Sequence, residues 1–384
     1  MRKRLIIMCL VGAALALGAA AQTAPVKVES PIVTEKDFVW YTEQKEAWKE
    51  VIQKAPHDEE AWQNYYLAAR YMAWFNPSDT TARQAISEMQ AAIPHTYTFN
   101  KCAYRAMMAG HGLEPKGDEY AETALSMMPS SLSYDDYNTW VCYLAMKGQQ
   151  ERMAQLAKRF FDSGLYSETV LRYNYNELAG IDDGGIIIVN GDAAVVPKWL
   201  IQEGMAMHRD KTVVCLSFLA VAEYREWLFK KLAIELPSWD SGSYDDYEKI
   251  LLQAIFDRYD HQVYFSTTVD MKLLEPWKQY LYNEGLTLKY SRKPYDNMTL
   301  KRRNVEERYM MEYLLVSFRP DWASGQHLAA NYAVVLADLL PYYAKHDRKR
   351  FDWLMHLLVS GVSNTSLSDE RKQEILQLLM QEPC

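Results

Sequence analysis

Residues 185–192 read GIIIVNGD and continue as AAVVPKWLIQEG to residue 204. Four successive β-branched side chains bounded by glycines predict a short strand that is buried on both faces. The Asn-Gly-Asp that follows is typical of a turn, and Pro197 suits the first position of a helix that continues to Met207. A strand that leads through a turn into a helix is the opening of an α/β unit.

The same alternation continues downstream. Further strands are predicted at residues 212–217, 263–269 and 286–290, and helices at 223–236, 244–259 and 273–283. Strands that alternate with helices favour βαβ crossovers, so residues 181–300 are predicted to form a small α/β domain with a parallel sheet.

The segment before this domain, residues 37–180, has the pattern of a helical repeat. Breaks at Pro56, Pro94, Pro129 and Gly164 are spaced by 38, 35 and 35 residues. That period is typical of tetratricopeptide-like arrays, in which helix pairs stack side by side. Each unit has an aromatic-rich first helix, whose rings are expected to fill the core. Tyr65, Tyr66 and Tyr104 are candidates for the alternative, an exposed contact surface for another protein.

The last part, residues 301–384, is again helical. We expect helices at 305–318, 325–344, 347–360 and 368–381, with Asn304 as the N-cap of the first. The predicted fold class is therefore mixed: an N-terminal tetratricopeptide-like array of α-helices, a small parallel α/β domain, and a helical C-terminal region.

The N-terminus has the pattern of a secretory signal. Arg2, Lys3 and Arg4 precede an apolar run at 5–17, and residues 19–21 form an Ala-Ala-Ala cleavage site. Residues 1–21 are thus predicted to be a signal peptide and residues 22–36 an extended lead. We expect an exported protein, in the periplasm or associated with the envelope, that has no transmembrane segment after cleavage.

Composition excludes several classes of function. The chain has 384 residues and a formal charge of -8, which argues against a nucleic-acid partner. Its eight histidines show no metal-binding spacing, and the sequence contains neither a phosphate-binding loop nor a nucleophile elbow. We therefore expect no metal, no cofactor and no catalytic residues. Cys102 and Cys142 lie in comparable helices of neighbouring repeats, where either one disulfide or two buried thiols is possible.

The α/β segment resembles the exported soluble region of the DUF2723 membrane proteins, which are related to protein O-mannosyltransferases. The resemblance covers about residues 180 to 290 and rests on Asn190-Gly-Asp192, Pro197, Trp199, Gln202-Glu203 and the strands near 213, 264 and 286. The resemblance implies that this segment has the fold of that soluble region and that the protein is exported. The polar residues expected after Asp192 are Ala193, Ala194 and Val195 here, and no multi-spanning membrane half is present, so glycosyl transfer is not implied.

Four residues are candidates for ligand binding: Asn190 and Asp192 at the first turn, Trp199 in the following helix, and Asp270 after the third strand. Ligands of parallel α/β sheets collect at the carboxyl ends of the strands, so Asp192 and Asp270 could converge there. The alternative is that each aspartate caps the helix that follows it. Trp199 could stack on a sugar ring or seal its helix against the sheet.

The sequence favours a non-catalytic protein of the cell envelope that acts in interaction or assembly through its helical repeats, with protein partners. The alternative is an accessory factor of envelope glycosylation that binds a glycan or a lipid-linked sugar at the α/β domain.

Overall fold

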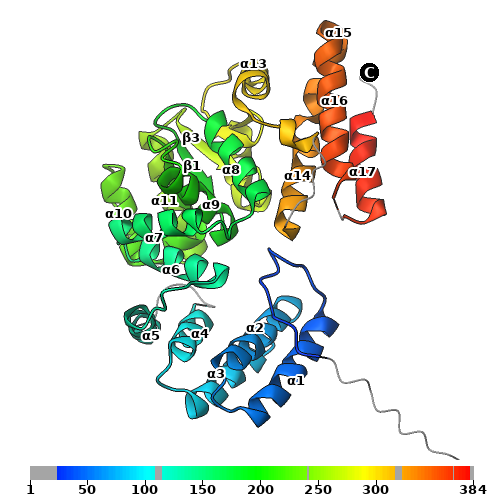
Figure 1. The fold of residues 1–384 in the computed structure, drawn as a ribbon. Coiled ribbons are helices and arrows are strands. Elements are labelled where there is room, and N and C mark those ends of the chain that lie inside the picture. The colour runs from blue at the N-terminus through cyan, green and yellow to red at the C-terminus, as the bar shows by residue number, and fades with distance from the viewer. Residues whose placement is uncertain (1–23, 109–114, 240–241, 316–321, 366, 381–384) are drawn as a thin grey trace, which may run out of the picture.

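The structure is a computed structural model that describes residues 24–108, 115–239, 242–315, 322–365 and 367–380. Three parts follow one another along the chain (Figure 1): an array of helices, a sheet flanked by helices, and a group of C-terminal helices. The described part is mostly helical and contains one small mixed sheet, which agrees with the mixed fold class. No helix in these ranges combines the length and the apolar character needed to cross a membrane.

The array consists of consecutive helices joined by short connections. Their bounds are α1 Phe38–Lys54, α2 Glu59–Phe75, α3 Thr81–Ala92, α4 Tyr97–Met107, α5 Pro115–Ser126, α6 Tyr134–Met146, α7 Gln150–Asp162 and α8 Glu168–Gly180. The four breaks in the sequence pattern precede α2, α4, α6 and α8. Side chains cap several of these helices: Asp58, Thr96 and Ser133, for example, accept N–H groups of α2, α4 and α6.

The aromatic residues of the array form its core. Tyr65, Tyr66 and Tyr104 are 3%, 0% and 2% exposed, so the core-packing interpretation is confirmed and these rings do not form a contact surface. Cys102 and Cys142 are both buried free thiols, which decides between the two possibilities for this pair.

The sheet has the order β2-β1-β3-β5-β4. Its strands are β1 Ile186–Val189, β2 Thr212–Cys215, β3 Val263–Ser266, β4 Leu281–Asn283 and β5 Thr287–Tyr290. Strand β1 pairs in parallel with β2 and with β3, as predicted. However, β5 is antiparallel to both β3 and β4, so the prediction of an all-parallel sheet was wrong for this strand.

The physical reason is a hairpin. The predicted helix at 273–283 is reduced to α12, Met271–Leu274, and a 3-10 helix, Glu275–Tyr280, and the chain then enters β4. The Glu284 N–H donates to the Thr287 carbonyl at 2.9 Å, and Gly285 adopts a φ of 116° that closes the turn. A connection this short can join only antiparallel strands.

Helices cover both faces of the sheet. On one face, α8 and α9, Asp192–Gly204, lie side by side, and on the other, Phe256 of α11, Tyr244–Arg258, packs edge-on against Phe265 of β3. Helix α10 spans Ala222–Lys231. Helix α9 begins at Asp192 rather than near Pro197, because Gly191 makes the turn out of β1 with a φ of 81°.

The C-terminal helices are α13 Asn297–Arg303, α14 Ala323–Leu336, α15 Leu340–His346, α16 Arg348–Ser363 and α17 Asp369–Met380. The helix predicted at 305–318 is wrong: a π-helical turn, Asn304–Arg308, and a short 3-10 helix, Glu312–Leu314, replace its described part, and residues 316–318 lie outside the described residues. Asn304 is buried inside the helical run rather than at its N-cap, because its Nδ2 donates to the Glu284 carbonyl at 2.8 Å.

Tyr309, Trp322 and the lead are among the contacts that hold the C-terminal region to the rest. The Tyr309 ring fits between Gly180 and Gly285, and its hydroxyl accepts the Leu286 N–H at 3.0 Å. The Trp322 ring lies 4.8 Å from that of Tyr134 and 4.9 Å from that of Tyr166. The lead crosses from the array to α14, where the Ile32 and Val33 carbonyls accept the Ser324 and Ala323 N–H groups, both at 3.0 Å.

Candidate functional site

Asp192 lies where the array meets the sheet. It is the first residue of α9 and follows Asn190 and Gly191, which form the turn out of β1. One carboxylate oxygen, Oδ1, accepts the Ala193 N–H at 2.9 Å, and Oδ2 accepts Nδ2 of Asn138, on α6, at 2.8 Å. The turn predicted from GIIIVNGD therefore contacts a helix of the array.

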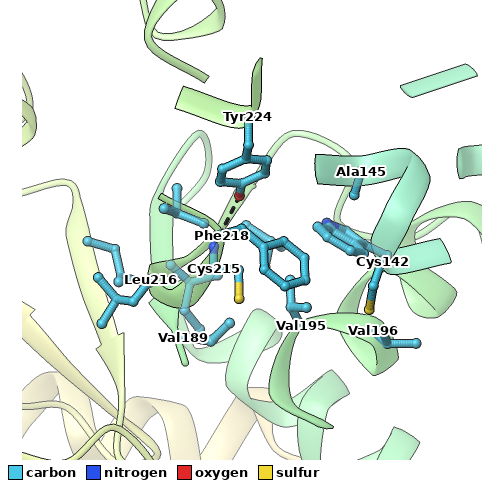
Figure 2. Packing of buried hydrophobic residues seen from close by; sticks show 14 of the residues in the cluster. Cys142, Ala145, Val189, Val195, Val196, Cys215, Leu216, Phe218 and Tyr224 are labelled. Atoms are coloured by element: carbon cyan, nitrogen blue, oxygen red, sulfur yellow. Dashed lines mark hydrogen bonds between the residues drawn. The ribbon is translucent and has the colours of Figure 1, made fainter. Parts of the chain in front are cut away.

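A cavity of about 310 Å³ opens at this contact, and we call it the joint cavity. Helices α2, α4 and α6 form one side, and the ends of β1 and β2 form the other. Its main polar side chains are Arg70, Arg105, Asn138, Asp192 and Ser217, and its apolar walls include Tyr104, Met108, Cys142, Met146, Phe218 and Val221. Figure 2 shows one residue from each side, Phe218 after β2 and Cys142 on α6, within the same packed cluster of buried residues. The carboxyl end of a parallel strand is where α/β proteins commonly bind ligands.

The two arginines of the cavity differ in their partners. Arg105 is held by Asp135, with Nη1 2.6 Å from Oδ1 and 2.5 Å from Oδ2. Arg70 uses Nη1 to donate to the Arg105 carbonyl at 3.0 Å and to the Tyr66 hydroxyl at 3.4 Å. The Nε of Arg70 is buried and has no acceptor among the described residues. Arg70 therefore offers a donor that the cavity itself leaves unused.

Asn138 offers the complementary acceptor. Its amide orientation is fixed because a carboxylate can only accept, so Nδ2 must face Asp192. The other end, Oδ1, is then buried, and within the described ranges no donor reaches it. A buried acceptor without a partner costs about 1–3 kcal/mol, so a ligand that donates to it gains affinity.

Cys142 and Ser217 are potential nucleophiles among the described lining residues of the cavity, and neither is activated near neutral pH. Burial raises the pKa of the Cys142 thiol well above its usual range, and the nearby Asp192 carboxylate raises it further. Burial also raises the pKa of Cys215 to about 11. The Ser217 hydroxyl lies 3.3 Å from the Cys215 sulfur, and none of the described lining residues is a histidine that could activate it. This arrangement suits binding.

The other predicted residues do not join Asp192. Asp270 caps α12 by accepting the Lys272 N–H at 2.9 Å, as the capping interpretation proposed. Asn190 is exposed. Trp199 is 6% exposed and packs against Phe218 with ring centroids 6.2 Å apart, which is the sealing role. Of the four candidates, only Asp192 is among the described residues that line the cavity.

Three cavity residues, Arg70, Arg105 and Asn138, were not predicted from the sequence. Each lies in a helix of the array, far along the chain from Asp192, and no local pattern pairs them with it. The one local signal is the capping box at Ser133 and Asp136, which fixes the start of α6 and hence the position of Asn138.

A second polar centre lies between α8 and α9. Lys198 and Glu177 are 0% and 1% exposed, and Nζ lies 2.5 Å from Oε2. Lys198 also donates to Asn174 Oδ1 at 2.5 Å, and the Ser266 hydroxyl at the end of β3 donates to Glu177 Oε1 at 2.5 Å. Burial lowers the pKa of Lys198. Because these groups satisfy one another, we interpret this centre as structural.

No group of His, Cys, Asp and Glu side chains able to hold a metal ion occurs in the described part of the chain. In comparisons with protein-family models, curated proteins and solved structures, none matches this chain. Its function therefore has to be inferred from its own residues.

Proposed function

We propose that this chain is an exported, non-catalytic protein of the cell envelope that binds another protein through its helical array, with repeats of the tetratricopeptide type. The observation that carries the proposal is an exposed aromatic patch, formed by Phe38, Val39, Trp74 and Phe75. These side chains are 39%, 61%, 59% and 53% exposed. Signal-type residues before the lead support export.

The patch is built by two adjacent helices. Phe38 lies at the start of α1 and Phe75 at the end of α2, and their rings pack edge-on at 6.1 Å. Trp74 extends the patch and packs edge-on against Tyr71 at 5.5 Å. A hollow of about 570 Å³ adjoins it, lined in part by Pro31, Ile32, Tyr41, Trp74, Phe75 and His327.

Physical arguments favour a protein partner for this surface. Large apolar side chains that gather on a surface mark interaction sites more often than isolated ones do. Tryptophan and tyrosine contribute disproportionately to the binding energy of protein interfaces. A hollow beside exposed rings would accept an apolar side chain of the partner.

The test is co-purification from the native envelope, followed by mass spectrometry. We expect the double variant Trp74→Ser/Phe75→Ser to lose a partner that the unaltered protein retains. Trp239→Ser is the matched control, since Trp239 is 47% exposed and lies in the α/β domain. Retention of every partner by the double variant would refute the role of the patch.

The glycan-binding alternative has weaker support. It placed the sugar at Asp192 and Asp270, with Trp199 as a stacking surface, but Asp270 caps α12 and the Trp199 ring packs against Phe218. Asp192 does line a polar cavity, but that cavity also holds Arg70, and a neutral sugar would pair with neither charge.

A further inference from the structure

We propose that the joint cavity binds a small zwitterion of the α-amino-acid type, a function separate from partner binding at the aromatic patch. Its carboxylate would bind Arg70 and its ammonium group would bind Asp192 and Asn138. The apolar walls would hold its side chain. Three observations carry this inference.

The first is an unpaired cation. Within the described residues, no carboxylate lies within ion-pair distance of Arg70, whereas Arg105 beside it is paired with Asp135. The Nε of Arg70 is buried without an acceptor. A carboxylate is the acceptor that guanidinium geometry matches best, through two parallel hydrogen bonds.

The second is an anion with a neighbouring acceptor. Asp192 has no Lys, Arg or His within ion-pair distance in the described part of the chain. Its carboxylate is oriented by the hydrogen bonds that it accepts from Asn138 and Ala193. Asn138 Oδ1 adds a buried acceptor without a donor. A carboxylate beside an amide oxygen requires donors, which an ammonium group supplies threefold together with the opposite charge.

The third is the size and lining of the cavity. Its volume of about 310 Å³ is at the small end of the range for small-molecule sites, which suits a metabolite. Met108, Met146, Phe218 and Val221 provide apolar surface, and methionine side chains adapt to differently shaped ligands.

Other ligand classes fit less well. A neutral polyol could satisfy the orphaned hydrogen-bonding atoms but would neutralise neither Arg70 nor Asp192. A phosphate dianion would be repelled by Asp192, and a metal cation by Arg70. A molecule that carries an ammonium group and a carboxylate on the same carbon supplies a partner for Asp192 and another for Arg70.

The experiment measures binding of the common L-amino acids, tested singly, to the purified protein by thermal shift and then by calorimetry. We expect at least one with an apolar side chain to raise the melting temperature. Its N-acetyl derivative lacks the ammonium charge and its amide lacks the carboxylate. We expect each derivative to bind about ten- to a hundredfold more weakly, in line with the loss of a hydrogen bond to a charged group.

Variants then locate the site. Asp192→Asn keeps the shape of the side chain and removes its charge, and we expect about a tenfold or greater loss of affinity. Asp270→Asn is the matched control, since that aspartate caps α12 outside the cavity, and it should bind normally. The proposal is overturned if no amino acid binds, if the N-acetyl derivative binds equally well, or if neutral monosaccharides stabilise the protein instead. Because the derivatives are tested on the unaltered protein, the result does not depend on the folding of a variant.

Discussion

Glu284 shows how the surroundings of one carboxyl group depend on distant residues. It is fully buried at the turn between β4 and β5. Its Oε1 accepts the Tyr295 hydroxyl at 2.7 Å, and Oε2 has no donor among the described residues. Burial raises the pKa of Glu284 above its ordinary value, and this outweighs the opposing effects of the Tyr295 hydrogen bond and of Lys289, whose Nζ lies 3.9 Å from Oε1.

A dependence of stability on pH follows from the raised pKa of Glu284. The native state holds the proton of Glu284 more tightly than the unfolded chain, so the free energy of unfolding should fall as pH rises from about 4.5 through the native pKa. A native pKa that lies one pH unit above the unfolded value changes the free energy of unfolding by about 1.4 kcal/mol. We expect Glu284→Gln to remove this contribution and to be more stable than the unaltered protein at neutral pH.

Urea unfolding of both proteins from acidic to neutral pH provides the measurement. Glu307→Gln, which removes an exposed charge nearby, is the control. Parallel pH profiles for the unaltered protein and Glu284→Gln would contradict the assignment.

At the scale of single residues, the sequence predicted those roles that depend on residues close by along the chain. Asp270 could be recognised as a cap because its partner, the Lys272 N–H, lies two residues away. Asp192 could be named as a candidate site residue because it follows a buried strand. The arginine and the asparagine that complete the cavity could not be found, since only folding brings α2 and α6 to that turn.

At the scale of elements, the contact between α8 and α9 depends on the buried pair of Glu177 and Lys198. We expect Lys198→Met to destabilise the protein by about 3–5 kcal/mol, because it leaves the Glu177 charge buried without a partner. The double variant Lys198→Met/Glu177→Leu should recover part of that loss, since it removes both charges.

Chemical denaturation of the three proteins measures these differences. Lys158→Met is the control, because Lys158 pairs with Asp162 on the surface of α7, and exposed pairs contribute about 0–1 kcal/mol. A loss from Lys198→Met no larger than that of the control would show that the buried pair is dispensable.

Element type was predictable where a pattern was long or strongly β-branched. The strand at Ile186–Val189 and the helix at Tyr244–Arg258 agree closely with the prediction. Strand β4 was missed because it has only three residues and follows a segment with helical composition. The direction of β5 depends on the tight turn at Gly285, which the sequence pattern did not reveal.

At the scale of the whole molecule, Trp322 anchors the C-terminal helices. It is 9% exposed and packs between Tyr134 and Tyr166. We expect Trp322→Ala to cost about 3–5 kcal/mol, the range for truncating a buried large aromatic residue. Loss of the anchor should also speed amide hydrogen exchange in α14 more than in α2.

Hydrogen exchange detected by mass spectrometry, together with thermal unfolding, tests this expectation. Trp74→Ala is the control, since that side chain is 59% exposed and should change stability by less than about 0.5 kcal/mol. Uniform acceleration across all helices would argue that Trp322 supports overall stability rather than this particular contact.

The succession of a helical part, an α/β part and a second helical part could be predicted, because apolar residues recur along the sequence with one period in helices and another in strands. Their arrangement could not, because it depends on contacts such as Tyr309 with Gly180 that join segments far apart in the chain. The hydrophobic core illustrates this: one continuous cluster unites Trp140 and Phe160 of the array with the strands of the sheet.

The hydrogen bonds between the lead and α14 have a consequence for the order of folding. The Val33 carbonyl accepts the Ala323 N–H, so the lead forms these hydrogen bonds with residues that lie about 290 positions further along the chain. Neighbouring helices of the array can pair as soon as they are synthesised, whereas this closure must wait until residues 323 and 324 have been synthesised. Contacts of such long sequence separation form late and slow folding. Until then, the hollow beside the aromatic patch lacks the wall that Ala323, Ser324 and His327 of α14 provide.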